Sequence, residues 1–157
     1  LQGRVWLKGV VKEGALHVAD AEPLPEKWEA RVEGKTFSAA LTEVYAWCDH
    51  MPMIGDGKNP RRQHLKLSVT LKNRTAQPLD VKVSRAFLSF DEKSEGAASG
   101  LTGAVTLQAN EEKVLQLRGD GLFDEGNHAK TLFVALILAA GAERLAVRAG
   151  GPVNETF

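Results

Sequence analysis

The chain has 157 residues, of which 43% are hydrophobic and 25% charged, and its twenty basic and twenty acidic residues cancel. This length suits one domain that buries roughly two-thirds of its unfolded surface. A neutral chain without a basic footprint argues against binding of nucleic acid or of an anionic membrane. The longest apolar run, residues 132–140, is about half as long as a membrane-spanning helix, so it predicts a buried strand instead.

The start at Leu1, with neither a methionine nor a charged and then apolar leader, is typical of a trimmed or mature chain. With a single cysteine, Cys48, the chain cannot form an internal disulfide. The lack of an internal disulfide is common among exported bacterial domains. We therefore expect a periplasmic or extracellular protein of the bacterial cell envelope.

The first elements are short strands. Residues 4–11 are rich in β-branched and aromatic side chains, and Glu13-Gly14 turns the chain into residues 15–19, which predicts a hairpin. Two prolines in the link at residues 22–25 remove backbone donors, so this link is excluded from a central strand. Residues 28–32 predict one further short strand.

Residues 36–48 fit two periodicities. Phe37, Leu41, Val44 and Cys48 follow a helical spacing, whereas alternate residues from Phe37 to Trp47 suit a strand. We favour the strand because the end of the segment is rich in β-formers. Residues 54–60 predict a loop from their glycine, asparagine and proline content.

The clearest pattern is the alternation of apolar and polar residues over 64–72. Residues 73–78 predict a turn, and residues 79–90 a return strand. Residues 92–100 are small and polar, which predicts an exposed loop. Four more strands are predicted at residues 104–107, 114–117, 131–138 and 145–147.

About nine short, mostly antiparallel strands without βαβ spacing predict an all-β sandwich or barrel. We expect a single domain over residues 1–151 and a short C-terminal tail at 152–157. The segment LKLSVTLKNRTAQPLDVKVSRAFLSF, residues 65–90, resembles the strand–Asn-turn–strand unit of immunoglobulin-like β-sandwich modules in exported bacterial proteins. The resemblance implies an immunoglobulin-like fold, a superfamily that carries many functions.

Side chains that bind soft metals cluster in the middle of the chain. Cys48, His50, Met53 and His64 would be the ligands of a copper site, with Met51 in reserve, because a thiolate, a thioether and imidazoles suit Cu(I). Core packing of the cysteine and methionines is the simpler interpretation. The third interpretation is that Cys48 is a reactive thiol.

A second group of candidate ligands carries oxygen atoms. Asp120, Asp124 and Asn127 lie in one Gly-rich segment and would suit calcium. Their spacing does not fit an EF-hand loop, and such residues also build ordinary hairpin turns.

The sequence carries no nucleophile elbow, phosphate-binding loop or zinc-protease helix, so we expect no enzyme. The aromatic residues Trp6, Trp28, Tyr45 and Trp47 could offer a platform to a sugar or a protein. We predict a non-catalytic interaction module that docks another protein through loops or a strand edge. The alternatives are copper binding or delivery, and a calcium-stabilised adhesion or carbohydrate-binding domain.

Overall fold

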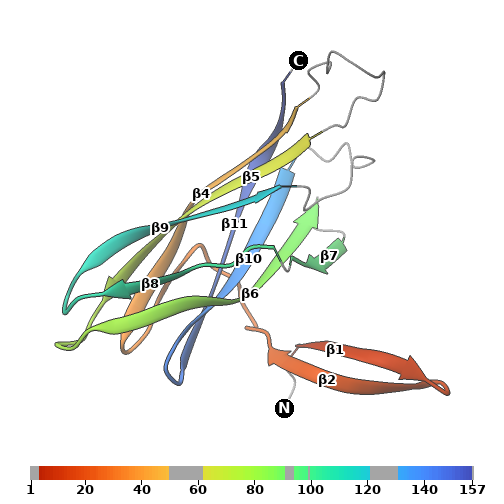
Figure 1. The fold of residues 1–157 in the computed structure, drawn as a ribbon, viewed down its shortest axis with the longest axis horizontal. Helices are drawn as coiled ribbons and strands as arrows, with labels where there is room; N and C mark the ends of the chain where they lie inside the picture. The colour runs from red at the N-terminus through yellow and green to blue at the C-terminus, as the bar shows by residue number, and fades with distance from the viewer. Residues whose placement is uncertain (1–3, 50–61, 91–93, 99, 121–130, 157) are drawn as a thin grey trace.

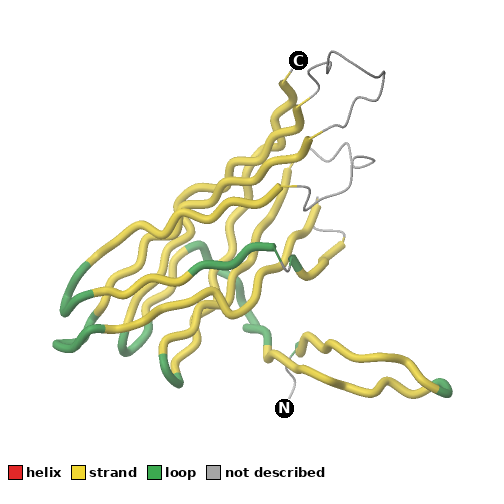
Figure 2. Tube along the Cα trace, in the orientation of Figure 1, coloured by secondary structure: helices red, strands yellow, loops and turns green. Residues whose placement is uncertain are grey.

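The computed structural model describes residues 4–49, 62–90, 94–98, 100–120 and 131–156, and these ranges are all-β (Figures 1 and 2). No helix in these ranges is long and apolar enough to cross a membrane. The strands are β1 (Val5–Lys12), β2 (Ala15–Pro23), β3 (Arg31–Glu33), β4 (Phe37–Asp49), β5 (Arg62–Asn73), β6 (Leu79–Phe90), β7 (Ser94–Ala97), β8 (Ala104–Leu107), β9 (Glu112–Asp120), β10 (Thr131–Ala140) and β11 (Glu143–Thr156).

The body is one continuous nine-stranded sheet that folds into two packed layers, and a separate two-stranded hairpin extends from it (Figure 1). One layer holds β4, β5 and β9, with β3 beside β4, and the other holds β7, β6, β10 and β11, with β8 beside β6. The strand β11 joins the layers, because its first part pairs with β10 and residues 153–156 run parallel to β4. The body is therefore a β-sandwich.

A glycine permits this change of layer in β11. A Cβ atom at Gly151 would lie 2.0 Å from the carbonyl oxygen of Val44 on β4, a separation that no side chain tolerates. Beyond this crossing the chain continues as a strand to Thr156. The tail expected at residues 152–157 is therefore wrong as far as Thr156, because these residues complete the sheet that contains β4.

The core lies between the layers and follows the predicted alternation. Leu65, Leu67, Val69 and Leu71 of β5 are all buried, and they pack with alternate residues of β10 such as Leu136. Residues 132–140 form the predicted buried strand, and residues 37–49 form a strand rather than a helix. The alternation over residues 64–72 thus predicted the buried face of β5.

Three details of the expected architecture are wrong. Residues 79–90 do not return beside 64–72, because β5 pairs with β4 and β9 while β6 lies in the other layer. Residues 94–97, expected in a loop, form β7 along the edge of β6. The described ranges hold eleven strands rather than nine.

Asn73 organises the crossing between β5 and β6. Its buried amide donates to the carbonyl oxygens of Gln77, Leu107 and Gln108, and its side-chain oxygen accepts from the backbone and hydroxyl of Thr75. One side chain thus connects the turn at residues 73–78 to the end of β8. Because buried polar groups must be satisfied, this network fixes the turn.

Candidate interaction surface

The hairpin of β1 and β2 is the feature that the core of the sandwich does not absorb. Glu13 and Gly14 both adopt positive φ, which gives the tight two-residue turn that matches the twist of the strands. A bulge follows Lys8, and there a Cβ at Gly9 would lie 2.2 Å from the carbonyl oxygen of His17. Glycine is therefore required at the bulge, which displaces one residue of β2 without breaking the ribbon.

An aromatic contact holds the base of the hairpin on the body. The Trp6 ring packs edge-on against Phe87 of β6, with 5.8 Å between ring centroids. The Arg85 guanidinium lies over the same Trp6 ring, 4.6 Å from its centroid. Trp6 also joins a small apolar cluster with Ile137 and Trp28 on the outer side of this layer. Trp6 thus anchors β1 on the body.

Ion pairs surround this aromatic contact. Glu22 of β2 is only 3% exposed, and both of its carboxylate oxygens accept from Nη1 of Arg144 on β11 at 2.5 Å. Arg85 pairs with Asp20, and its Nε lies 4.0 Å from Glu22. Because the Glu22 charge is buried, the two guanidinium groups are needed to offset its desolvation. These ion pairs tie β2 to β6 and β11, while Trp6 holds β1 on β6.

The opposite face of the hairpin is apolar and exposed. Cross-strand pairing places Leu7 opposite Ala21, Val11 opposite Leu16, and Gly9 opposite Val18 on this face. Of the eight large hydrophobic side chains that are exposed in the described ranges, six lie in the hairpin and five of these share this face. We call this set the apolar hairpin face; its members are Val5, Leu7, Val11, Leu16 and Val18.

The other face of the hairpin is mixed. It carries Trp6 and Glu22 at the anchored base, and Lys8, Lys12 and His17 further out. Val10 is its exposed apolar residue, at 59%, beside Val11 at 69% on the apolar hairpin face. Since a two-stranded ribbon alone is only marginally stable in water, an ordered ribbon with one bare apolar face is suited to covering by a partner.

The predicted copper ligands are only partly within the described ranges. Cys48 pairs with Gln63 and packs against the core, whereas His64 pairs with Trp47 on the outer face of the same sheet. The structure therefore does not bring Cys48 and His64 together. His50, Met51 and Met53 lie outside the described residues, as do Asp124 and Asn127 of the calcium hypothesis. No group of three or more metal-binding side chains occurs within the described ranges.

His64 has two partners on the outer face. Its ring stacks on Trp47, with centroids 4.8 Å apart, and Nδ1 donates to Asp120 of β9 at 2.6 Å. Tyr45 continues the row, 5.2 Å from Trp47. The expected platform of four aromatic residues is thus divided, because Trp6 and Trp28 lie on the other layer. The Trp47–His64 contact joins β4 to β5, and such cross-strand pairs stabilise a sheet, whereas Tyr45 and Trp47 are neighbours on one face of β4.

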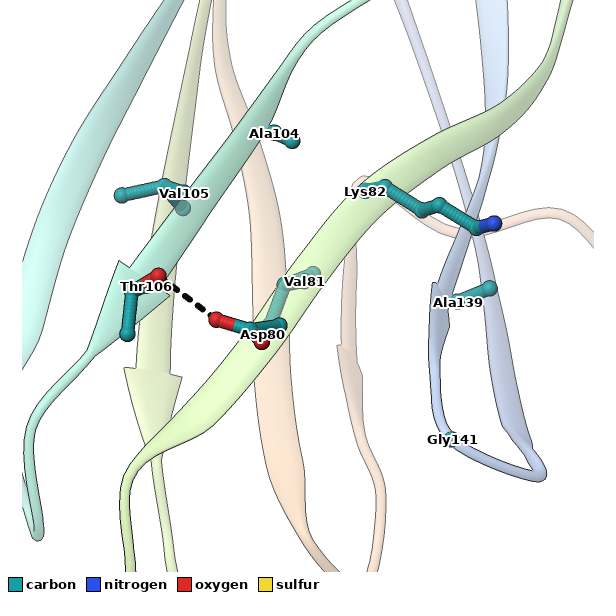
Figure 3. A pocket seen from close by; sticks show the side chains of 8 residues that line it. All are labelled: Asp80, Val81, Lys82, Ala104, Val105, Thr106, Ala139 and Gly141. Carbon is teal, nitrogen blue, oxygen red and sulfur yellow. Dashed lines mark hydrogen bonds between the residues drawn. The ribbon is translucent and has the colours of Figure 1, made fainter.

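Two open hollows lie among the described residues. One, of about 580 Å³, lies at the end of the sandwich near β8, where Asp80 accepts a hydrogen bond of 2.5 Å from Thr106 and Lys82 lies nearby (Figure 3). The other, of about 430 Å³, lies between the base of the hairpin and β6 and is lined by Trp6 and Arg85 among others. The Asp80 carboxylate and the Thr106 hydroxyl in Figure 3 bond to each other, so these two groups already have a partner within the protein. We therefore take the apolar hairpin face as the candidate interaction surface.

Neither a protein-family model nor a curated protein matches this sequence. Among solved structures, a candidate lipoprotein from Bacillus subtilis is similar, with a TM-score of 0.47 and 14% identity over 80% of this chain and 39% of that one. A FixG-related protein from Vibrio parahaemolyticus gives 0.42 and 11%, covering 73% and 95%. An uncharacterised β-sandwich protein from Clostridium difficile gives 0.38 and 10%, covering 81% and 99%.

Sequence reasoning identified the hairpin but missed its apolar face. Each of Val5, Leu7 and Val11 is an ordinary strand residue, so none is unusual alone. The available signal was the face that they share with Leu16 and Val18 once the Glu13-Gly14 turn fixes the register. The sequence does not show whether the body of the protein covers this face.

Proposed function

We propose that this chain is a non-catalytic interaction module of the bacterial cell envelope that docks an apolar protein surface through the apolar hairpin face. One observation carries the proposal: an ordered ribbon, anchored by Trp6 and Glu22, presents five large hydrophobic side chains to solvent. Contiguous exposed apolar patches commonly mark interaction sites. The periplasmic or extracellular location is proposed from the single cysteine, since exported bacterial domains commonly lack an internal disulfide.

We also propose that the sandwich is immunoglobulin-like. In that fold the first, second and fifth strands share one sheet, and the third, sixth and seventh share the other. Here β4, β5 and β9 share one layer and β6, β10 and β11 the other, which supports this assignment, whereas β8 pairs with β6 and not in the layer of β4, where the constant-type fold has its fourth strand. The β1–β2 hairpin is then an addition to the immunoglobulin-like fold. Because this hairpin exposes an apolar face to solvent, a role in docking is favoured.

Site-specific photo-crosslinking tests the docking function. A photoreactive amino acid is introduced at position 11, on the apolar hairpin face, or at position 10, its neighbour on the mixed face. We expect protein adducts in the producing cells from position 11 and few from position 10. The adduct should be lost with Val18→Lys, on the same face, and kept with His17→Lys, on the mixed face.

Two results would overturn the proposal. Equal labelling from positions 10 and 11 would mean that the face has no particular role. Absence of protein adducts at position 11, with the hairpin shown to be folded by its Trp6 contact, would mean that the face is not a docking site.

A further inference from the structure

Resting on the proposed function, we infer that the surface covered by the apolar hairpin face is the same face of a second copy of this chain. The two ribbons would stack face to face about a two-fold axis. Such a symmetric contact uses one surface patch twice, so it requires only that the patch be complementary to itself.

The charge distribution favours such a self-complementary contact. Residues 4–23 contain three basic and three acidic residues, and the pairing places none of the charged strand residues among the five members of the apolar hairpin face. Any occupant must therefore offer a long, narrow and uncharged surface. A second copy meets these requirements by construction. An anionic lipid surface fits less well, because the cations Lys8 and Lys12 lie on the opposite face.

The length and exposed area of the hairpin are also compatible with a weak dimer. A strand of eight residues is roughly 27 Å long, and stacked sheets lie about 10 Å apart, which leaves room for interdigitated Val and Leu side chains. The five side chains expose on the order of 400 Å² of apolar surface, within the range of the largest patches on monomers. Two such faces together bury about 800 Å², below the roughly 1,000 Å² at which stable specific interfaces begin. We therefore expect a weak dimer that forms and dissociates with concentration.

The ribbon geometry supports stacking of faces rather than pairing of edges. Joining two hairpins edge to edge would extend the sheet but leave both apolar faces in water. Face-to-face stacking removes Val11, Leu16 and Val18 from water, and hydrophobic burial is the dominant driving force in most associations. The anchored base keeps Trp6 on the body, so each sandwich remains clear of the contact at the outer part of its ribbon (Figure 1).

Sedimentation velocity on the purified chain tests this inference. We expect the wild type to shift from monomer towards dimer between roughly 5 and 500 µM, as a small interface requires. Val11→Lys should weaken the association at least about tenfold, because it places a charge in an apolar contact. The matched control Val10→Lys should behave as wild type. A second variant, Leu16→Gln, repeats the test with a smaller change.

A wild type that stays monomeric throughout, or equal effects of Val10→Lys and Val11→Lys, would overturn the dimer. The photo-crosslinking experiment separates this failure from that of the docking function. Adducts of twice the chain mass from position 11 support the second copy. Adducts of another mass alone refute it while leaving the docking function intact, and absence of any protein adduct refutes both.

Discussion

Glu22→Gln should release the hairpin from the sandwich without unfolding the sandwich. Glu22 is buried, and its carboxylate accepts two bonds of 2.5 Å from Arg144. A hydrogen bond between charged groups contributes about 1.5–3 kcal/mol, and the half-exposed Arg144 side chain places this pair at the lower end. We therefore expect a loss of about 1.5–2 kcal/mol in the free energy of local hairpin opening.

Hydrogen exchange followed by mass spectrometry measures this loss element by element. A change of 1.4 kcal/mol is tenfold, so amides of β1 and β2 should exchange roughly 10–30 times faster in the variant. Amides of β5 and β10 should keep their rates, because the core does not contain Glu22. The control Glu13→Gln changes a carboxylate in the exposed turn and should leave all rates unchanged.

Two results would refute this reasoning. Unchanged exchange in β1 and β2 would mean that the ion pairs do not anchor the ribbon. Equal acceleration in β5 and β10 would mean that the hairpin and the sandwich unfold as one unit.

Three further predictions concern the sandwich. Gly151→Ala should cost at least about 2 kcal/mol in unfolding free energy, measured by urea denaturation, because the new Cβ meets the Val44 carbonyl oxygen; wild-type stability would contradict the role of this crossing. Asn73→Ala should cost about 2–3 kcal/mol by the same assay, since it leaves buried carbonyl groups without a donor. Burial raises the pKa of Glu143, but hydrogen bonds from Thr36 and adjacent backbone N–H groups outweigh this and lower the pKa below its ordinary 4.5. A lowered folded-state pKa stabilises the fold above about pH 5, and this contribution is lost as the pH falls through that pKa. Glu143→Gln should therefore destabilise the protein at pH 7 but progressively less in acid, and a pH-independent difference in thermal midpoint would refute this.

The sequence predicted the parts of the fold that depend on local pattern. Alternation from Leu65 to Leu71 predicted a half-buried strand, and the structure buries those four side chains. Alternation does not reveal which strand lies beside it, so β6 was placed next to β5 instead of in the opposite layer. The side chain of Asn73 shows why: it closes a crossing turn, which resembles a hairpin turn in composition.

The candidate site was harder to predict because it depends on register and on what covers a surface. That Cys48 and His64 lie on opposite faces follows from the pairing of Trp47 with His64 and of Cys48 with Gln63, a register that the sequence pattern does not reveal. The Glu13-Gly14 turn fixes the strand register, and from this register the members of the apolar hairpin face could be derived. Their exposure to solvent could not be derived from the sequence. Exposure depends on Trp6 directing the opposite face towards the body.

Methyl NMR spectra at two concentrations test the central claim most directly. Between about 20 µM and about 1 mM, a weak dimer becomes substantially populated. We predict that the methyl signals of Val11, Leu16 and Val18 shift with concentration, while those of Val10 on the mixed face and Val114 on β9 stay fixed. Shifts at Val10 or Val114 equal to those at Val11, or no shift at Val11, would contradict the claim that the apolar hairpin face is the docking surface between copies.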